Sequence, residues 1–144
     1  MNLLRVHALA ALVFVAAIVV QVVLAGLAIA NLGGSGDFSE HADFGYTWVG
    51  LAAVVLLATA LSARRPRRDV GIAVALFVDY IVQTALPSAR GSLPFLAALH
   101  PLNAMVLFAV ASWYGLRVWR IAFRPAPAAA AGMPASPAIE GEVA

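Results

Sequence analysis

Six polar side chains that could carry chemistry lie within or at the edges of long apolar stretches of the 144-residue sequence. A bilayer interior has no water to solvate such groups, so polar and ionisable residues there usually face a partner or a cavity. Imidazoles can bind a metal or a haem iron, a carboxylate can carry protons, and carboxamides can bond between helices. The six residues are His41, His100, Asp79, Gln21, Gln83 and Asn103.

The composition is that of a membrane protein. Apolar residues make up 63% of the chain and charged residues 11%, whereas soluble domains have about 45–50% and about 25%. The absence of cysteine excludes disulfides, thiolate metal sites, iron–sulfur clusters and dithiol-to-quinone electron transfer. The basic residues are all arginines placed beside the apolar stretches, so they indicate membrane orientation and give little support for nucleic-acid binding.

Four apolar segments have lengths close to the roughly 20 residues that a helix needs to cross a bilayer. They predict an all-α fold: an antiparallel four-helix membrane bundle over residues 1–124, with spans at about 8–30, 44–61, 70–86 and 95–116. The first segment could instead be a secretory signal, but it is longer than the usual signal core of about 7–15 residues, which favours a retained span. We find no internal repeat.

The arginines predict which side of the membrane each loop occupies. Arg90 stands alone on one side, and eight others share the opposite side, which the positive-inside rule makes cytoplasmic. We therefore expect a multi-pass protein of the cell (plasma) membrane with both termini in the cytoplasm. The eight are Arg5, Arg64, Arg65, Arg67, Arg68, Arg117, Arg120 and Arg124.

Local signals place the helix ends. The spacing of Asp37–Glu40 is that of a capping box, so the second helix is predicted to begin just before His41. Ser92 suits the N-cap of the fourth helix, and Pro101 predicts a local bend in its first turns. The tail at 125–144 is rich in Pro and Ala and is expected to be a disordered cytoplasmic extension.

The predicted topology makes two histidines a possible pair. The second and fourth helices run in the same direction, and His41 and His100 each lie near the external start of one of them. Two such helices can present imidazoles across a bundle core and hold a haem edge-on, with one neutral imidazole on each face of the iron. We therefore interpret both histidines as candidate metal ligands of a haem iron.

Neighbouring residues fit this interpretation. Gly45 and Ala104 each follow a histidine by four positions, on the same helix face, and leave room for a porphyrin ring; Gly26 near the outer end of the first helix could do the same. Arg90 is proposed as a partner for the haem propionates. Glu40 and Asp43 are close enough in sequence to His41 to form a polar shell.

Ordinary explanations exist for the same residues. A histidine at a membrane interface needs no metal, and His7, which has no histidine partner on its side, is interpreted as a plain interfacial residue. Asp79 could carry protons in a small transporter, but a protonated carboxyl bonded to Gln21, Tyr80 or a backbone carbonyl is the favoured interpretation.

Two further sets of residues are expected to be structural. The carboxamides of Gln21, Gln83 and Asn103 are interpreted as interhelical hydrogen-bonding groups. The tryptophans and two tyrosines, Trp48, Trp113, Trp119, Tyr46 and Tyr114, are interpreted mostly as interfacial belts.

The sequence also resembles a known group. The segments 21–26, 41–46 and 99–104, with His-x-x-x-Gly in the second helix and His-Pro-x-Asn-Ala in the fourth, resemble small uncharacterised four-helix membrane proteins common in actinobacteria. The resemblance covers roughly residues 5–120. The histidine pattern is similar to one half of the haem A synthases and to four-helix b-type cytochromes, which implies haem coordination by His41 and His100. This chain has one candidate pair and no second bundle, which favours a single haem over an enzymatic reaction.

The sequence therefore predicts a membrane haem b protein that transfers electrons or belongs to a respiratory or redox assembly. It identifies no catalytic residue and leaves open whether the chain is an enzyme, with a stand-alone enzyme the less favoured interpretation. Its partners would be the lipid bilayer, a quinol or redox protein, and a larger complex or a second copy of the chain. The alternatives are a non-haem accessory or assembly subunit, and a small proton-coupled transporter that uses Asp79.

Overall fold

The computed structural model describes residues 2–30 and 36–124, and every regular element within them is helical. Four of its helical stretches are long and apolar enough to cross a membrane. The all-α prediction is confirmed, and four candidate spans indicate a multi-pass membrane protein. The elements are α1 (Leu3–Ala30), α2 (Ser39–Phe44), η1 (Gly45–Val49), α3 (Gly50–Ser62), α4 (Arg67–Ala85), η2 (Leu86–Gly91), α5 (Pro94–Ala98) and α6 (His100–Ala122).

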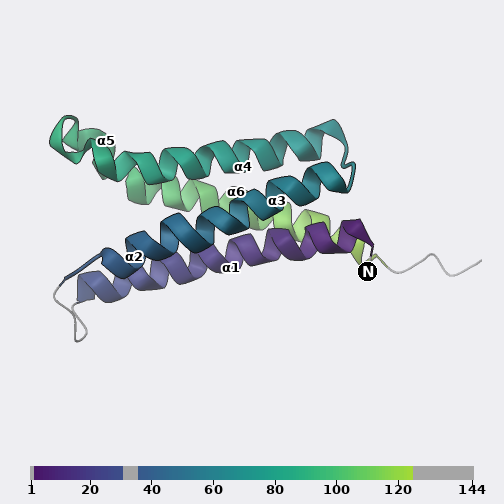
Figure 1. Ribbon diagram of the computed structural model, residues 1–144, viewed down its shortest axis with the longest axis horizontal. Helices are drawn as coiled ribbons and strands as arrows, with labels where there is room; N and C mark the ends of the chain where they lie inside the picture. The colour runs from purple at the N-terminus through teal and green to yellow at the C-terminus, as the bar shows by residue number, and fades with distance from the viewer. Residues whose placement is uncertain (1, 31–35, 125–144) are drawn as a thin grey trace, which may run out of the picture.

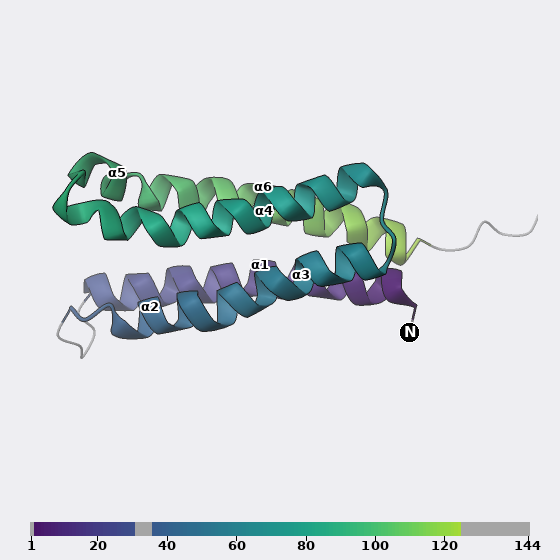
Figure 2. The ribbon, with the colours of Figure 1, turned by 45° about the horizontal axis from the view of Figure 1, so that its top comes forward.

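The long helices lie side by side and alternate in direction (Figures 1 and 2). Helix α1 packs against α3 and α6, and α4 packs against the same two helices, so α1 faces α4 diagonally and α3 faces α6 diagonally. The ends of the bundle differ in chemistry. One, the arginine end, holds the start of α1, the α3–α4 turn and the end of α6; the other, the histidine end, holds α2, η2 and α5.

Small and aromatic side chains fill the interior. Phe14, Leu56 and Tyr114 are fully buried or nearly so, while many large aliphatic side chains point outward, such as Ile29 (75% exposed) and Met105 (70% exposed). A soluble monomer rarely exposes so much apolar surface. These outward side chains suit contact with lipid.

The second membrane-length helix is continuous but changes its winding. It begins at Ser39, just before His41 as predicted, and passes from α2 through the π-helical turn η1 into α3. The capping box does not form as predicted: Phe38 is the N-cap and gives no side-chain bond. Asp37 instead accepts hydrogen bonds from the hydroxyl and backbone N–H of Ser39, and these bonds lower the pKa of the Asp37 carboxyl.

Hydrogen bonds connect the π-helical turn η1 to α4. The Tyr80 hydroxyl lies 3.2 Å from the carbonyl oxygen of Gly45 and 3.3 Å from that of Tyr46. The absence of a side chain at Gly50 allows this approach, since a Cβ there would come within 2.5 Å of the Tyr80 hydroxyl. Turns of this kind are rare and often occur at functional sites.

The fourth predicted helix is divided in two. Helix α5 ends at Ala98, and α6 starts at His100, directly before Pro101. Proline has no N–H to bond the carbonyl four residues earlier and its ring crowds that carbonyl. The helix is interrupted at Leu99, whose backbone remains right-handed helical (φ −77°, ψ −12°). The N-cap of α5 is Leu93, not Ser92. The tail at 125–144 lies outside the described residues.

The α3–α4 turn contains a residue with strained backbone. Arg64 has φ of 48°, a left-handed conformation that glycine adopts more readily than other residues. The N–H of Arg65 bonds to the carbonyl of Ala60, and that of Arg64 to Leu61. These two bonds are the pattern that closes a helix C-terminus, and they make the sharp reversal into α4.

Candidate functional site

The histidines predicted to pair do lie together inside the histidine end. His41 is on α2 and His100 starts α6, so they come from helices that face each other diagonally. Their ring centroids are 6.2 Å apart and their planes are nearly perpendicular, at 82°. Both residues are half-buried. The antiparallel connection therefore brings two imidazoles 59 positions apart in sequence into one place.

Each imidazole is held by a backbone carbonyl of a neighbouring helix. Nδ1 of His41 lies 3.0 Å from the Gln21 carbonyl oxygen, and Nδ1 of His100 lies 2.9 Å from that of Gln83. A carbonyl oxygen only accepts, so Nδ1 carries the proton in both rings. In the neutral imidazole, Nε2 is then left with its lone pair.

The glutamine side chains surround the two Nε2 atoms. Nε2 of Gln21 is 3.1 Å from Nδ1 and 3.2 Å from Nε2 of His41, and it donates to the His41 carbonyl at 2.7 Å. Nε2 of Gln83 is 3.4 Å from Nε2 of His100, and the Asn103 amide donates to Gln83 Oε1 at 2.9 Å. The interpretation of these carboxamides as interhelical groups is confirmed, and the bonds surround the histidine pair.

The two halves of the chain build this site in the same way, although no repeat was found in the sequence. Gln83 lies 62 positions after Gln21, and each offers its backbone carbonyl to a histidine at the start of the following helix. The same offset relates buried positions along α1 and α4: His7 and Asp69, Ala11 and Ala73, Phe14 and Leu76, Ile18 and Tyr80. The bundle therefore has an approximate two-fold axis parallel to its helices.

The small residues near the histidine pair differ in whether they leave space inside the bundle. Gly45 is buried and borders the site, because a Cβ there would come within 2.7 Å of Gln21 Nε2. The space beside it is filled by the Gln21 carboxamide, whose buried Oε1 has no hydrogen-bond partner within residues 2–30 and 36–124. Ala104 is half-buried on α6. Gly26 is exposed and a Cβ there would meet no atom within 4 Å, so it adds no room inside the bundle.

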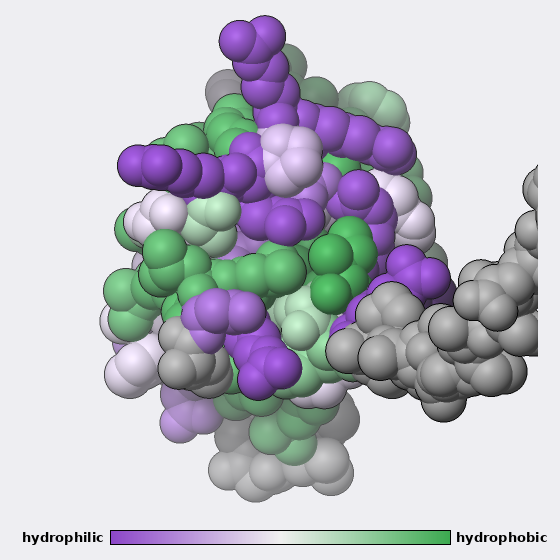
Figure 3. All heavy atoms as spheres, turned by 90° about the vertical axis from the view of Figure 1, so that its right-hand side faces the viewer, coloured by the Kyte–Doolittle hydropathy of each residue, from purple (hydrophilic) through white to green (hydrophobic). Residues whose placement is uncertain are grey.

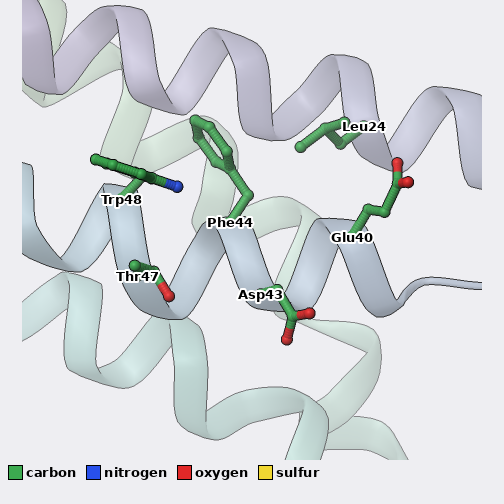
Figure 4. A pocket seen from close by; sticks show the side chains of 6 residues that line it. All are labelled: Leu24, Glu40, Asp43, Phe44, Thr47 and Trp48. Atoms are coloured by element: carbon green, nitrogen blue, oxygen red, sulfur yellow. The ribbon is translucent and has the colours of Figure 1, made fainter.

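The charged residues near the histidine end lie outside its interior. Arg90 is exposed on η2. Glu40 and Asp43 are also exposed and line a surface hollow of about 370 Å³ together with Leu24, Phe44, Thr47 and Trp48. In Figure 4, Phe44 and Glu40 point toward α1, whereas Asp43 points away from it. The polar partner of His41 is thus the Gln21 carbonyl rather than either carboxylate.

Asp79 lies near the middle of α4 and is half-buried. The hydrogen bonds that were expected for it do not form among the described residues: Gln21 bonds to His41 and the Tyr80 hydroxyl bonds to the π-helical turn.

A second polar cluster, which we call the inner network, lies at the arginine end. His7 is fully buried; its Nδ1 lies 3.0 Å from the Thr59 hydroxyl and its Nε2 lies 2.8 Å from the Tyr114 hydroxyl. The Tyr114 hydroxyl is also 3.3 Å from the backbone carbonyl of Asp69. The interpretation of His7 as an interfacial residue is therefore wrong, because α3 and α6 close over it.

The inner network ends in a buried ion pair. The Asp69 carboxylate is 0% exposed and accepts from both Arg65 and Arg117. One hydrogen-bonded group thus joins all four long helices. Tyr114, expected in an interfacial belt, is completely buried here, whereas Tyr46 and the three tryptophans are 37% to 59% exposed. Asp69 was not singled out from the sequence, although its position four residues after Arg65 is typical of a helical ion pair.

The residues described include no group of three or more His, Cys, Asp or Glu side chains able to hold a metal ion. The histidine pair offers two ring nitrogens, and a porphyrin would supply four more.

Comparison with known proteins gives one match. No curated protein and no solved structure matches the chain, so no similarity to a haem protein is found. Residues 21–89 are similar to a family of unknown function (DUF6220), which is consistent with the expected resemblance to an uncharacterised group. The matched segment includes Gln21, His41, Gly45 and Gln83 and ends before His100.

Proposed function

We propose that this chain is a four-span membrane protein that binds one haem b between His41 and His100, at the external face of the plasma membrane. Both termini and the arginine end would lie in the cytoplasm, as the positive-inside rule predicts. A haem whose iron takes two protein ligands has no open position for a substrate, which favours electron transfer within a redox assembly. When bound, the group would supply one-electron chemistry.

One observation carries the proposal: both Nδ1 atoms are bonded to backbone carbonyls. Histidines that bind metals usually donate their second ring N–H to a carbonyl, carboxylate or water, which fixes the tautomer and the ring orientation. The carbonyls of Gln21 and Gln83 do this for the two rings. Each Nε2 would then be the ligating atom, and the two histidines come from helices that face each other diagonally.

His41 and His100 are also close enough to hold one group between them, since their ring centroids are 6.2 Å apart. A porphyrin would lie between the rings, so the carboxamides of Gln21 and Gln83 would turn away from the two Nε2 atoms. The Gln21 carboxamide fills the space beside Gly45, so its movement would open that space, and Arg90 remains our proposed propionate partner.

Visible spectroscopy of the purified full-length chain tests the proposal. After expression with added haem precursor, the reduced-minus-oxidised spectrum should show a Soret and an α band. His41→Ala and His100→Ala should each abolish or shift these bands. Gln21→Ala should retain them, because its backbone carbonyl stays in place. A well-folded preparation without haem bands, or unchanged bands in both histidine variants, would refute the proposal.

His7 provides the matched control, since it is the third histidine of the chain. His7→Gln keeps a hydrogen-bonding side chain in the inner network and should leave the spectrum unchanged. Size-exclusion profiles of all variants separate loss of the ligand from loss of the fold.

The half-buried Asp79 supports a second candidate, the proton-coupled transporter. In reconstituted vesicles, Asp79→Asn should abolish proton-coupled flux in that case and leave any haem spectrum intact. Flux that is unchanged in this variant would dismiss the transporter.

A further inference from the structure

The arginine end carries far more positive charge than it neutralises. Within residues 2–30 and 36–124, the ion pairs there are those of Asp69 with Arg65 and Arg117. The other six arginines of this end have no acidic partner among the described residues. In Figure 3 hydrophilic side chains project over part of this end, beside apolar surface. This excess of positive charge favours an anionic partner. The arrangement of the arginines indicates the chemical class of that partner.

Two of these arginines line a hollow in the surface. A hollow of about 510 Å³ at the end of α6 is lined by Arg120, Arg124, Trp119, Phe123 and Ile121. Trp119 and Arg120 lie in the last turn of α6, and Phe123 and Arg124 lie just beyond its end at Ala122. Two aromatic side chains, which we call the aromatic row, and two guanidinium groups thus border the same hollow. The hollow therefore combines cationic and apolar walls.

The aromatic row is ordered by its neighbours. The Trp119 and Phe123 rings have centroids 4.1 Å apart at 32°, and the Arg5 guanidinium lies 5.3 Å from the Phe123 centroid. Arg5 comes from α1, so two helices contribute to the site. Trp119 and Phe123 are each 37% exposed. Half-exposed aromatic side chains at a helix end are typical of the headgroup level of a bilayer.

We propose that this hollow binds the headgroup of an anionic phospholipid. The guanidinium groups of Arg120 and Arg124 would donate hydrogen bonds to its phosphate oxygens, a geometry for which arginine is well suited. Trp119, Ile121 and Phe123 would contact the glycerol and the first methylenes of the acyl chains. Basic clusters next to membrane helices bind anionic lipids in this way. The inference is independent of haem binding.

Native mass spectrometry of the full-length chain in detergent, titrated with phosphatidylglycerol or phosphatidylcholine at fixed salt, tests the proposal. We expect preferential binding of phosphatidylglycerol, weakened about tenfold or more in the double variant Arg120→Gln/Arg124→Gln. The matched control, Arg67→Gln/Arg68→Gln, removes the same charge from the start of α4 and should weaken binding less than threefold. Equal effects of the two double variants, or equal binding of the two lipids, would overturn the discrete site.

A local measurement identifies the occupant. In a Trp48→Phe/Trp113→Phe background, the emission of Trp119 should change on titration with phosphatidylglycerol and not with phosphatidylcholine. The competing occupant is the acidic end of the chain itself, which carries Glu140 and Glu142. If phosphatidylglycerol affects Trp119 only after Glu140→Gln/Glu142→Gln substitution, the hollow belongs to that segment and the lipid proposal fails.

Discussion

Replacing Tyr114 by Phe should destabilise the protein without making a cavity. Tyr114 and His7 are both 0% exposed, and the tyrosine hydroxyl lies 2.8 Å from His7 Nε2. The Thr59 hydroxyl donates to the Val55 carbonyl, so His7 Nδ1–H donates to Thr59 and Nε2 must accept from Tyr114. The variant leaves this acceptor without its tyrosine donor.

The expected loss of unfolding free energy follows from the burial of this unpaired acceptor. An acceptor left unpaired inside a protein costs about 1–3 kcal/mol, whereas single interhelical hydrogen bonds in a membrane protein average about 0.6 and reach about 1.7 kcal/mol. We expect the free energy of unfolding to fall by about 1–2 kcal/mol, since both partners are completely buried and the phenyl ring retains its packing.

Reversible unfolding in dodecylmaltoside micelles with increasing dodecyl sulfate, followed by circular dichroism, gives this quantity. Tyr46→Phe is the matched control: Tyr46 is 59% exposed, so its loss should stay within about 0.5 kcal/mol. A cycle with His7→Leu isolates the pair. A Tyr114→Phe loss below about 0.3 kcal/mol, within the error of additivity, would refute the assigned hydrogen bond.

Three further substitutions test other contacts by the same unfolding assay. Arg64→Gly should stabilise by about 0.5–1 kcal/mol, because glycine relieves the left-handed backbone at this position; an equal gain from Arg64→Ala would contradict this explanation. Gly50→Ala should destabilise by about 1–3 kcal/mol, since its Cβ would lie 2.5 Å from the Tyr80 hydroxyl, whereas Gly71→Ala meets no atom within 4 Å and should not destabilise. Asp69→Asn leaves two arginines without their carboxylate and should cost about 3 kcal/mol; a neutral result would show that the ion pair contributes nothing.

Hydropathy and arginine placement were sufficient to predict the helices. Four segments of near-spanning length are visible without a structure, and alternation of direction then puts His41 and His100 at one end. The sequence could not predict the rotation of each helix about its axis, which determines the face that points into the bundle. Helix α1 is apolar on all sides, so its pattern does not identify an inner face. His7 therefore looked interfacial, and Gly26 looked as useful as Gly45.

The features that the sequence did not predict also depend on how the helices pack against one another. The inner network depends on burial of Asp69 and Tyr114, and only packing of four helices determines that burial. The break before His100 was visible as Pro101, but its extent depended on whether neighbouring groups could replace the lost hydrogen bond. The correspondence between the two halves of the chain is not visible in the sequence, because positions 62 residues apart are alike in burial more than in residue type. His7, for example, corresponds to Asp69.

The approximate two-fold axis has a consequence for assembly. Each half of the chain, residues 3–62 and 67–122, contributes one glutamine carbonyl, one imidazole and half of the interior. The turn that joins them contributes no group to the histidine pair. Two polypeptides separated at that turn would thus carry complementary halves of the pair, and its formation from them in a membrane would report directly on whether the halves recognise each other.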